Sequence, residues 1–103
     1  MSRKDSRRTL LVALGPSDLE WLRNRAQGRS LGDTVRRIVE AGLARTVHDV
    51  GYIPSEPQRR LPVQLPKMVR SKVETLAQNW NKPREYVVWQ AIRHSQSGPT
   101  DPE

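Results

Sequence analysis

The two halves of this sequence repeat one another, and this internal repeat constrains the fold more than any other feature of the chain. Four apolar positions match apolar positions 51 residues later, and three more match at a spacing of 53 residues. The matched pairs are Val12 with Val63, Leu14 with Leu65, Leu22 with Val73, Ala26 with Ala77, Val35 with Val88, Ile38 with Ala91 and Val39 with Ile92. The change in spacing falls in a turn between two predicted helices, where length varies most easily. We therefore expect two copies of one structural unit.

The first unit, residues 9–44, has the pattern of a strand followed by two helices. A short run rich in Leu and Val over residues 9–14 predicts the strand, and Gly15-Pro16 ends it. Pro16 suits the first turn of a helix that extends to about Ala26. Ser30 then predicts the N-cap of a second helix, which ends near Gly42.

The second unit, residues 60–95, follows the same plan. Polar and apolar residues alternate over 60–65 and predict a half-buried strand, which Pro66 stops. Helical spacing of apolar residues continues over 67–78, a turn is expected at 79–82, and Pro83 opens the last helix. The rest of the chain is predicted to be a basic flexible arm (1–8), a linker (45–59) and a polar flexible tail (96–103).

Neither unit of about 35 residues buries enough apolar surface to fold alone. A lone strand would also leave both of its edges unpaired. Pairing the two strands antiparallel, with four helices packed beneath them, solves both problems, and a linker of about 16 residues spans up to ~50 Å. The predicted fold is mainly α with a two-stranded antiparallel β-ribbon, in which the two units form an intramolecular pseudo-dimer.

The composition favours a polyanionic partner. The net charge is +7 and the isoelectric point is about 10.8, which suits nucleic acid, an anionic membrane surface or an acidic protein. No cysteine is present, His48 and His94 have no ligand-spaced partners, and no nucleophile–base set appears. The longest apolar run, Leu10 to Leu14, is far too short to span a bilayer. We therefore expect neither an enzyme nor a metal or cofactor site, no membrane association, and a cytoplasmic, nucleoid-associated protein.

Each unit resembles the ribbon-helix-helix family of DNA-binding proteins, which includes Arc repressor, the methionine repressor and CopG. The resemblance lies in an alternating strand that ends in Leu, a first helix that ends near an Ala, a polar turn, and a cap before the second helix. These features are Thr9–Leu14, Ala26 and Ser30 in the first unit and Arg60–Leu65, Ala77 and Pro83 in the second. Two such units in one chain are similar to the TraY-type conjugation proteins.

The resemblance implies that the ribbon enters the DNA major groove, where outward strand side chains contact base edges. By position, the base-reading residues would be Thr9, Leu11, Ala13, Arg60, Pro62 and Gln64. The phosphate-binding residues would be Ser30, Leu31, Gly32, Lys82, Pro83 and Arg84, together with Arg3, Lys4, Arg7 and Arg8 of the arm.

Three residues depart from the family pattern. Leu11 and Ala13 can contact a thymine methyl group but cannot form hydrogen bonds, so readout is expected mainly from Thr9, Arg60 and Gln64. Pro62 fits inside a strand only if its nitrogen faces a free edge.

The resemblance implies a transcriptional repressor that binds double-stranded DNA. An accessory DNA-binding protein of a conjugation or partition complex and an antitoxin-type protein-interaction module are the alternatives. Trp21, Tyr86 and Trp89 fall off the main apolar stripes, so they are candidates either for self-association of chains on DNA or for covering the edge of a thin core.

Overall fold

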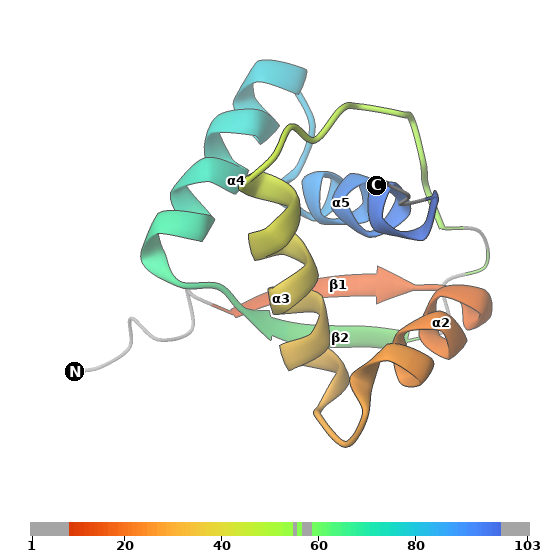
Figure 1. Cartoon of the computed structure of the whole chain (residues 1–103). Coiled ribbons are helices and arrows are strands. Elements are labelled where there is room, and N and C mark those ends of the chain that lie inside the picture. Colours follow the sequence, from red (N-terminus) through yellow and green to blue (C-terminus); the bar gives the residue numbers. More distant parts are fainter. Residues whose placement is uncertain (1–8, 55, 57–58, 98–103) are drawn as a thin grey trace.

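The computed structural model describes residues 9–54, 56 and 59–97 and is mainly helical, with one two-stranded antiparallel sheet (Figure 1). The predicted arm, with Arg3, Lys4, Arg7 and Arg8, and most of the predicted tail lie outside the described residues. The elements are β1 (Thr9–Leu14), α2 (Pro16–Ala26), α3 (Leu31–Leu43), β2 (Arg59–Gln64), α4 (Lys67–Trp80) and α5 (Arg84–Ser97). The predicted mainly helical class with an antiparallel ribbon is confirmed.

Three predicted boundaries are wrong by one to two residues. Gln96 and Ser97, expected in the flexible tail, belong to α5. The second strand begins at Arg59 and ends at Gln64, one residue earlier than expected. Asn79 and Trp80, expected in a turn, form the last residues of α4. The helix ends only at Asn81, whose left-handed backbone (φ 58°) lets its N–H bond the carbonyl groups of Ala77 and Gln78.

Alternation along the two strands divides the ribbon into an inner and an outer face. Val12, Leu14, Leu61 and Val63 are fully or almost fully buried, whereas Leu11 on the other face is 52% exposed. Successive strand side chains point to opposite faces, so the apolar set on one face forms the floor of the core. The four helices cover that face with the remaining core residues, which include Leu19, Leu22, Val35, Val39, Val73, Val88 and Ile92.

The second helix of each half packs against the strand of the other half. Helix α3 contacts β2, helix α5 contacts β1, and α3 and α5 contact each other across the middle of the molecule (Figure 1). Residues from both halves of the chain therefore contribute to one core.

Arg59, the last residue of the predicted linker, belongs to β2, whereas the described residues before it form no helix or strand. Hydrogen bonds hold part of this segment to α5. The fully buried side chain of Gln90 accepts hydrogen bonds from the backbone N–H groups of Val50 and Tyr52 and donates one to the carbonyl of Tyr52. The hydroxyl of Tyr52 in turn donates to the carboxylate of Asp18 in α2. Residues 50–52 of the connection are therefore held to both α5 and α2.

Candidate nucleic-acid interface

The outer face of the ribbon brings together all six residues predicted to read bases. In the observed register Thr9 lies opposite Gln64, Leu11 opposite Pro62, and Ala13 opposite Arg60. The β2 residues and Leu11 are exposed, while Thr9 and Ala13 are partly exposed. The amide of Gln64 also lies 3.5 Å from the hydroxyl of Thr9, which aligns these two polar side chains across the strands.

The nitrogen of Pro62 faces a free edge of the ribbon, which is the condition for a proline inside a strand. Ala13 directs its N–H and C=O away from β2, toward side chains of α5. Outward and inward backbone groups alternate along an antiparallel pair, so Leu11 and its partner Pro62 also direct theirs to the free edges. The ring nitrogen of Pro62 therefore costs the ribbon no hydrogen bond.

Side chains of α5 close the free edge of β1. The carboxylate of Glu85 accepts a hydrogen bond from the N–H of Ala13, and the indole N–H of Trp89 donates to its carbonyl at 2.8 Å. Trp89 is therefore half-buried and bonded within the fold. These contacts tie α5, which begins at Arg84, to β1.

The other two aromatic candidates for self-association differ in exposure. Tyr86 is buried and its hydroxyl donates a hydrogen bond to Asp49, which favours the alternative that this ring covers the edge of the core. Trp21 is half-buried against the core, and the guanidinium of Arg25 lies over its ring at 4.6 Å. Both rings therefore cover edges of the core, and Trp21 keeps an exposed part.

The free edge of β2 borders an open cleft at the start of α3. A cleft of about 400 Å³ is lined by Ser30, Gly32, Asp33, Arg36, Pro62 and Gln64. A side chain at Gly32 would meet the carbonyl oxygen of Pro62, because an ideal Cβ there lies 2.6 Å from that atom. The close approach of α3 to the ribbon thus depends on glycine, and it sets predicted phosphate-binding residues next to predicted base-reading ones.

A carboxylate that the sequence analysis did not include in the site also sits at this helix start. The N–H of Asp33 donates to Ser30 Oγ at 3.1 Å, the expected N-cap. The Asp33 carboxylate accepts hydrogen bonds from Arg36 (2.6 and 3.1 Å) and Arg37 (3.2 Å). These hydrogen bonds hold the pKa of the Asp33 carboxyl below its usual value, and those from Arg36 have the largest effect. Residues three and four positions apart on a helix are neighbours, so this cluster could have been predicted from the sequence.

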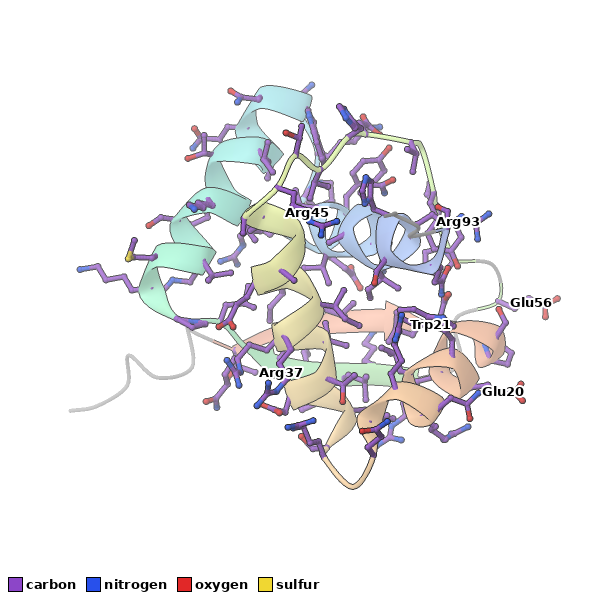
Figure 2. The ribbon with its side chains drawn as sticks, viewed as in Figure 1. Glu20, Trp21, Arg37, Arg45, Glu56 and Arg93 are labelled. Carbon is purple, nitrogen blue, oxygen red and sulfur yellow. The ribbon has the colours of Figure 1, made fainter. Side chains whose placement is uncertain are left out.

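The charge around the α3 start remains positive in spite of this carboxylate. Arg29 lies 3.8 Å from Asp33, and Arg36 also pairs with Glu40 at 2.8 Å, so three arginines face two carboxylates. Figure 2 labels the Arg37 side chain on α3. The arrangement can contact an anion through side chains whose guanidinium groups are held in place by neighbouring acids.

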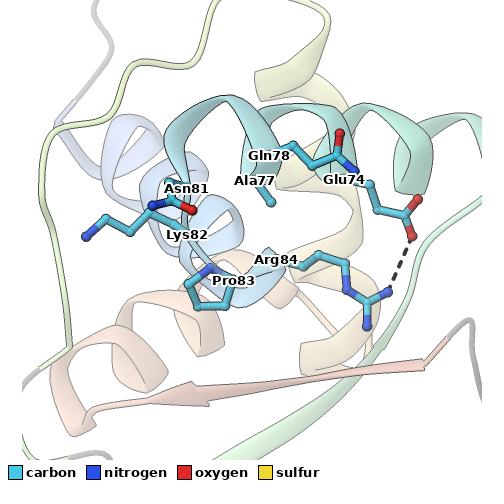
Figure 3. Close-up of a pocket in the computed structure, with 7 residues that line it drawn as sticks. All are labelled: Glu74, Ala77, Gln78, Asn81, Lys82, Pro83 and Arg84. Atoms are coloured by element: carbon cyan, nitrogen blue, oxygen red, sulfur yellow. Dashed lines mark hydrogen bonds and ion pairs between the residues drawn. The ribbon is translucent and has the colours of Figure 1, made fainter.

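The start of α5 presents the second predicted phosphate cluster. Lys82, Pro83 and Arg84 are exposed and line a shallow pocket of about 640 Å³ against the end of α4 (Figure 3). Arg84 lies 3.5 Å from Glu74, and the Lys82 ammonium lies 5.1 Å from the centre of the Tyr86 ring. The pocket holds cationic and amide side chains but no nucleophile–base pair.

Searches for other kinds of site give few candidates. His48 and His94, 46 positions apart in the sequence, have ring centroids 6.4 Å apart, but no group of three metal-ligating side chains occurs among the described residues. None of the described helices is long and apolar enough to cross a membrane. No protein-family model matches the chain, and comparisons with curated proteins and with solved structures find no significant match.

Proposed function

We propose that this protein binds double-stranded DNA in a sequence-specific way by inserting its β-ribbon into the major groove, and that it acts as a transcriptional repressor. The observation that carries the proposal is the outer ribbon face, where Arg60 and Gln64 stand exposed beside Leu11. A two-stranded ribbon fits the major groove of B-DNA. The net charge of +7 supports a phosphate-rich partner.

The proposal includes a pseudo-dimer of two related halves within one chain. The strand register supports this organisation, because it is consistent with the repeat spacing of 51 residues. Leu11 and Pro62 are equivalent positions and lie directly opposite each other. The same spacing makes Leu10 equivalent to Leu61 and Val12 equivalent to Val63. The flanking pairs Leu10–Val63 and Val12–Leu61 are therefore equivalent to each other. An approximate two-fold axis through the Leu11–Pro62 pair would produce this register.

The two strands offer different chemistry to DNA. Arginine can form two hydrogen bonds with guanine, and glutamine can form two with adenine. Arg60 lies opposite the small side chain of Ala13, which leaves the guanidinium free to extend outward. Leu11 offers only apolar contact to a thymine methyl group. Base discrimination is therefore assigned mainly to β2, and one chain would recognise an asymmetric element.

The experiment begins with selection of bound sequences from random duplex DNA at fixed salt. Affinity is then measured for the selected duplex and its single-base variants. Arg60→Ala is expected to cost about 1–3 kcal/mol and to relax preference at one base pair. Leu11→Ala should cost less. Arg59→Ala is the matched control, because Arg59 carries the same charge one position along the strand but off the outer face.

Two results would contradict this assignment. Unchanged base preference in Arg60→Ala would show that Arg60 does not read a base. Failure of the selection to enrich any sequence would refute sequence-specific binding itself. The regulatory role is tested separately, by transcription in vitro from a promoter that overlaps the selected site, where a repressor lowers the yield of transcript.

A further inference from the structure

A small cavity lies between α2, α3 and α5. Its volume is about 200 Å³, and it is lined by residues of these three helices and by Arg45, which follows α3. None of its described lining residues belongs to β1 or β2. The cavity is therefore separate from the ribbon face to which DNA binding is assigned.

Small residues keep this cavity open. Ala41 and Gly42 line it from α3, and Ala91 lines it from α5. A Cβ placed on Gly42 would lie 3.6 Å from the Cβ of Ala91, so the two helices approach each other closely at this point. Larger side chains at these positions would fill the space beside the helix crossing.

Three nitrogen-containing side chains from different parts of the chain line the same cavity. They are Arg25 near the end of α2, Arg45 after α3, and His94 in the last turn of α5. Ser95 adds a hydroxyl group beside His94. No aspartate or glutamate is among the described lining residues. The lining thus offers several hydrogen-bond donors and no carboxylate that would compete for them.

The two arginines are also not neutralised elsewhere. Four other arginines form salt bridges with carboxylates within the described part of the chain, whereas neither Arg25 nor Arg45 does so there. Carboxylates of the surrounding helices have other partners: Asp18 accepts hydrogen bonds from Tyr52 and Gln96, and Glu40 pairs with Arg36. An anion in the cavity would therefore meet unpaired positive charge.

The ring of Trp21 holds the guanidinium of Arg25. The central carbon of that guanidinium lies 4.6 Å from the centre of the indole ring. An arginine stacked on an aromatic face keeps the N–H groups in its own plane available to acceptors, and it loses less freedom when it binds one. The half-buried Trp21 therefore serves as a platform that orients a donor.

A purely structural role does not account for the whole arrangement. Cations near helix C-termini offset the helix dipole, and Arg25 and His94 both lie in the last turn of their helices. That role requires each cation only at its own helix end. It does not require that side chains from three separate segments line one cavity without a carboxylate.

We propose that this cavity binds the phosphate group of a small phosphate compound, independently of the proposed DNA binding. The guanidinium forks of Arg25 and Arg45 match the oxygens of a phosphate group, and the His94 ring and the Ser95 hydroxyl can donate to the remaining oxygens. Sites for drug-sized ligands measure roughly 300–1,000 Å³. The smaller volume here suits the phosphate group with little else enclosed.

The test is a titration of the ¹⁵N-labelled full chain with inorganic phosphate, followed by NMR. Sodium chloride keeps the ionic strength constant, so general screening of charge does not change. Saturable shifts are expected for the backbone amides of Gly42, Ala91 and Ser95, and none for those of the ribbon. The absence of saturable shifts at these amides at millimolar phosphate would refute the proposal.

Charge variants separate the cavity from the general positive charge of the protein. Arg25→Gln and Arg45→Gln should each weaken phosphate binding by about tenfold, because each removes hydrogen bonds to a charged acceptor. Arg23→Gln is the matched control, since it removes the same charge from an exposed position on α2 that does not line the cavity. All three positions are exposed, and circular dichroism checks that the variants fold. Equal weakening by Arg23→Gln and Arg25→Gln would overturn the site.

Two further ligands identify the source of the phosphate group. Tighter binding of glycerol 3-phosphate than of inorganic phosphate would support the site and indicate a phosphorylated metabolite. Equal or weaker binding would support the site and indicate free phosphate. If a DNA duplex shifts the cavity amides and inorganic phosphate does not, the surface contacts the DNA backbone and the proposed site is wrong.

Discussion

Replacing Gly32 by alanine tests the contact that positions α3 against the ribbon. In most helices this change stabilises, because alanine is favoured over glycine by up to about 1 kcal/mol. Here the new Cβ would stand 2.6 Å from the carbonyl oxygen of Pro62, and real Cβ contacts closer than 3.0 Å are essentially absent. Either α3 or the middle of β2 must move by at least about 0.4 Å. Neither neighbour is a flexible side chain that could turn away.

The expected change in the free energy of unfolding is the cost of overpacking, reduced by the helix preference for alanine over glycine. Overpacking of this kind costs about 1–3 kcal/mol, so Gly32→Ala should destabilise the protein by about 1–2 kcal/mol. Gly42→Ala is the matched control in the same helix, because its Cβ would meet only the side chains of Val47 and Ala91, at 3.4 and 3.6 Å. That variant should be neutral or more stable by up to about 1 kcal/mol.

Urea unfolding followed by circular dichroism measures both changes, and thermal melting gives an independent check. In a domain of this size each kcal/mol shifts Tm by about 4–8 °C. The reasoning is refuted if Gly32→Ala is as stable as the unchanged protein, or if the two variants shift stability equally. In either case α3 would not approach the carbonyl of Pro62 as closely as described.

Three further predictions concern the arm, the connection and the shared core. Deleting residues 2–8 should lower DNA affinity for all sequences and flatten the salt dependence, and an unchanged slope in salt titrations would exclude contact between the arm and DNA. Burial and, to a lesser extent, the hydrogen bond to Asp18 raise the pKa of Tyr52 to about 12. Because folding raises this pKa, the neutral Tyr52 hydroxyl contributes its full stabilisation of the fold below pH 10. This contribution is lost as the pH rises through 12. Tyr52→Phe should lower the free energy of unfolding measured in urea, and this difference should shrink over that pH range. A difference that stays constant would contradict the raised pKa of Tyr52. Isolated segments 1–50 and 55–103 should not fold as monomers, which circular dichroism of each at low micromolar concentration can check, and a cooperative melt from either would refute the shared core.

Most of the secondary structure was predictable because each element carries its own local pattern. The first strand and first helix match their expected bounds, since Gly15-Pro16 interrupts the backbone pattern between them. The outer face of the ribbon was also predictable, because alternation along each strand and antiparallel pairing together decide which side chains share a face. The end of α4 was not, because Asn79 could have adopted the left-handed conformation through which Asn81 terminates the helix two residues later.

Contacts between distant parts of the chain account for what the sequence did not reveal. Glu85 and Trp89 bond Ala13 across 72 and 76 positions, and nothing in the local pattern of α5 marks them as partners of a strand. Gln90 interrupts an apolar helix face and would be expected at the surface. Its amide is buried because the connection between the halves supplies backbone groups that match it. Such matches depend on where the chain returns in space.

The edges of the ribbon bear on the proposal that its outer face, and not its backbone, binds a partner. Exposed strand edges tend to pair with other strands. Here both edges are interrupted by different means. Side chains of Glu85 and Trp89 occupy the backbone groups of Ala13 on β1. On β2, Pro62 has no N–H to donate, and Gly32 brings α3 against its carbonyl. Both edges thus lack an uninterrupted row of free backbone groups, which disfavours addition of a third strand and agrees with the proposed use of the outer face.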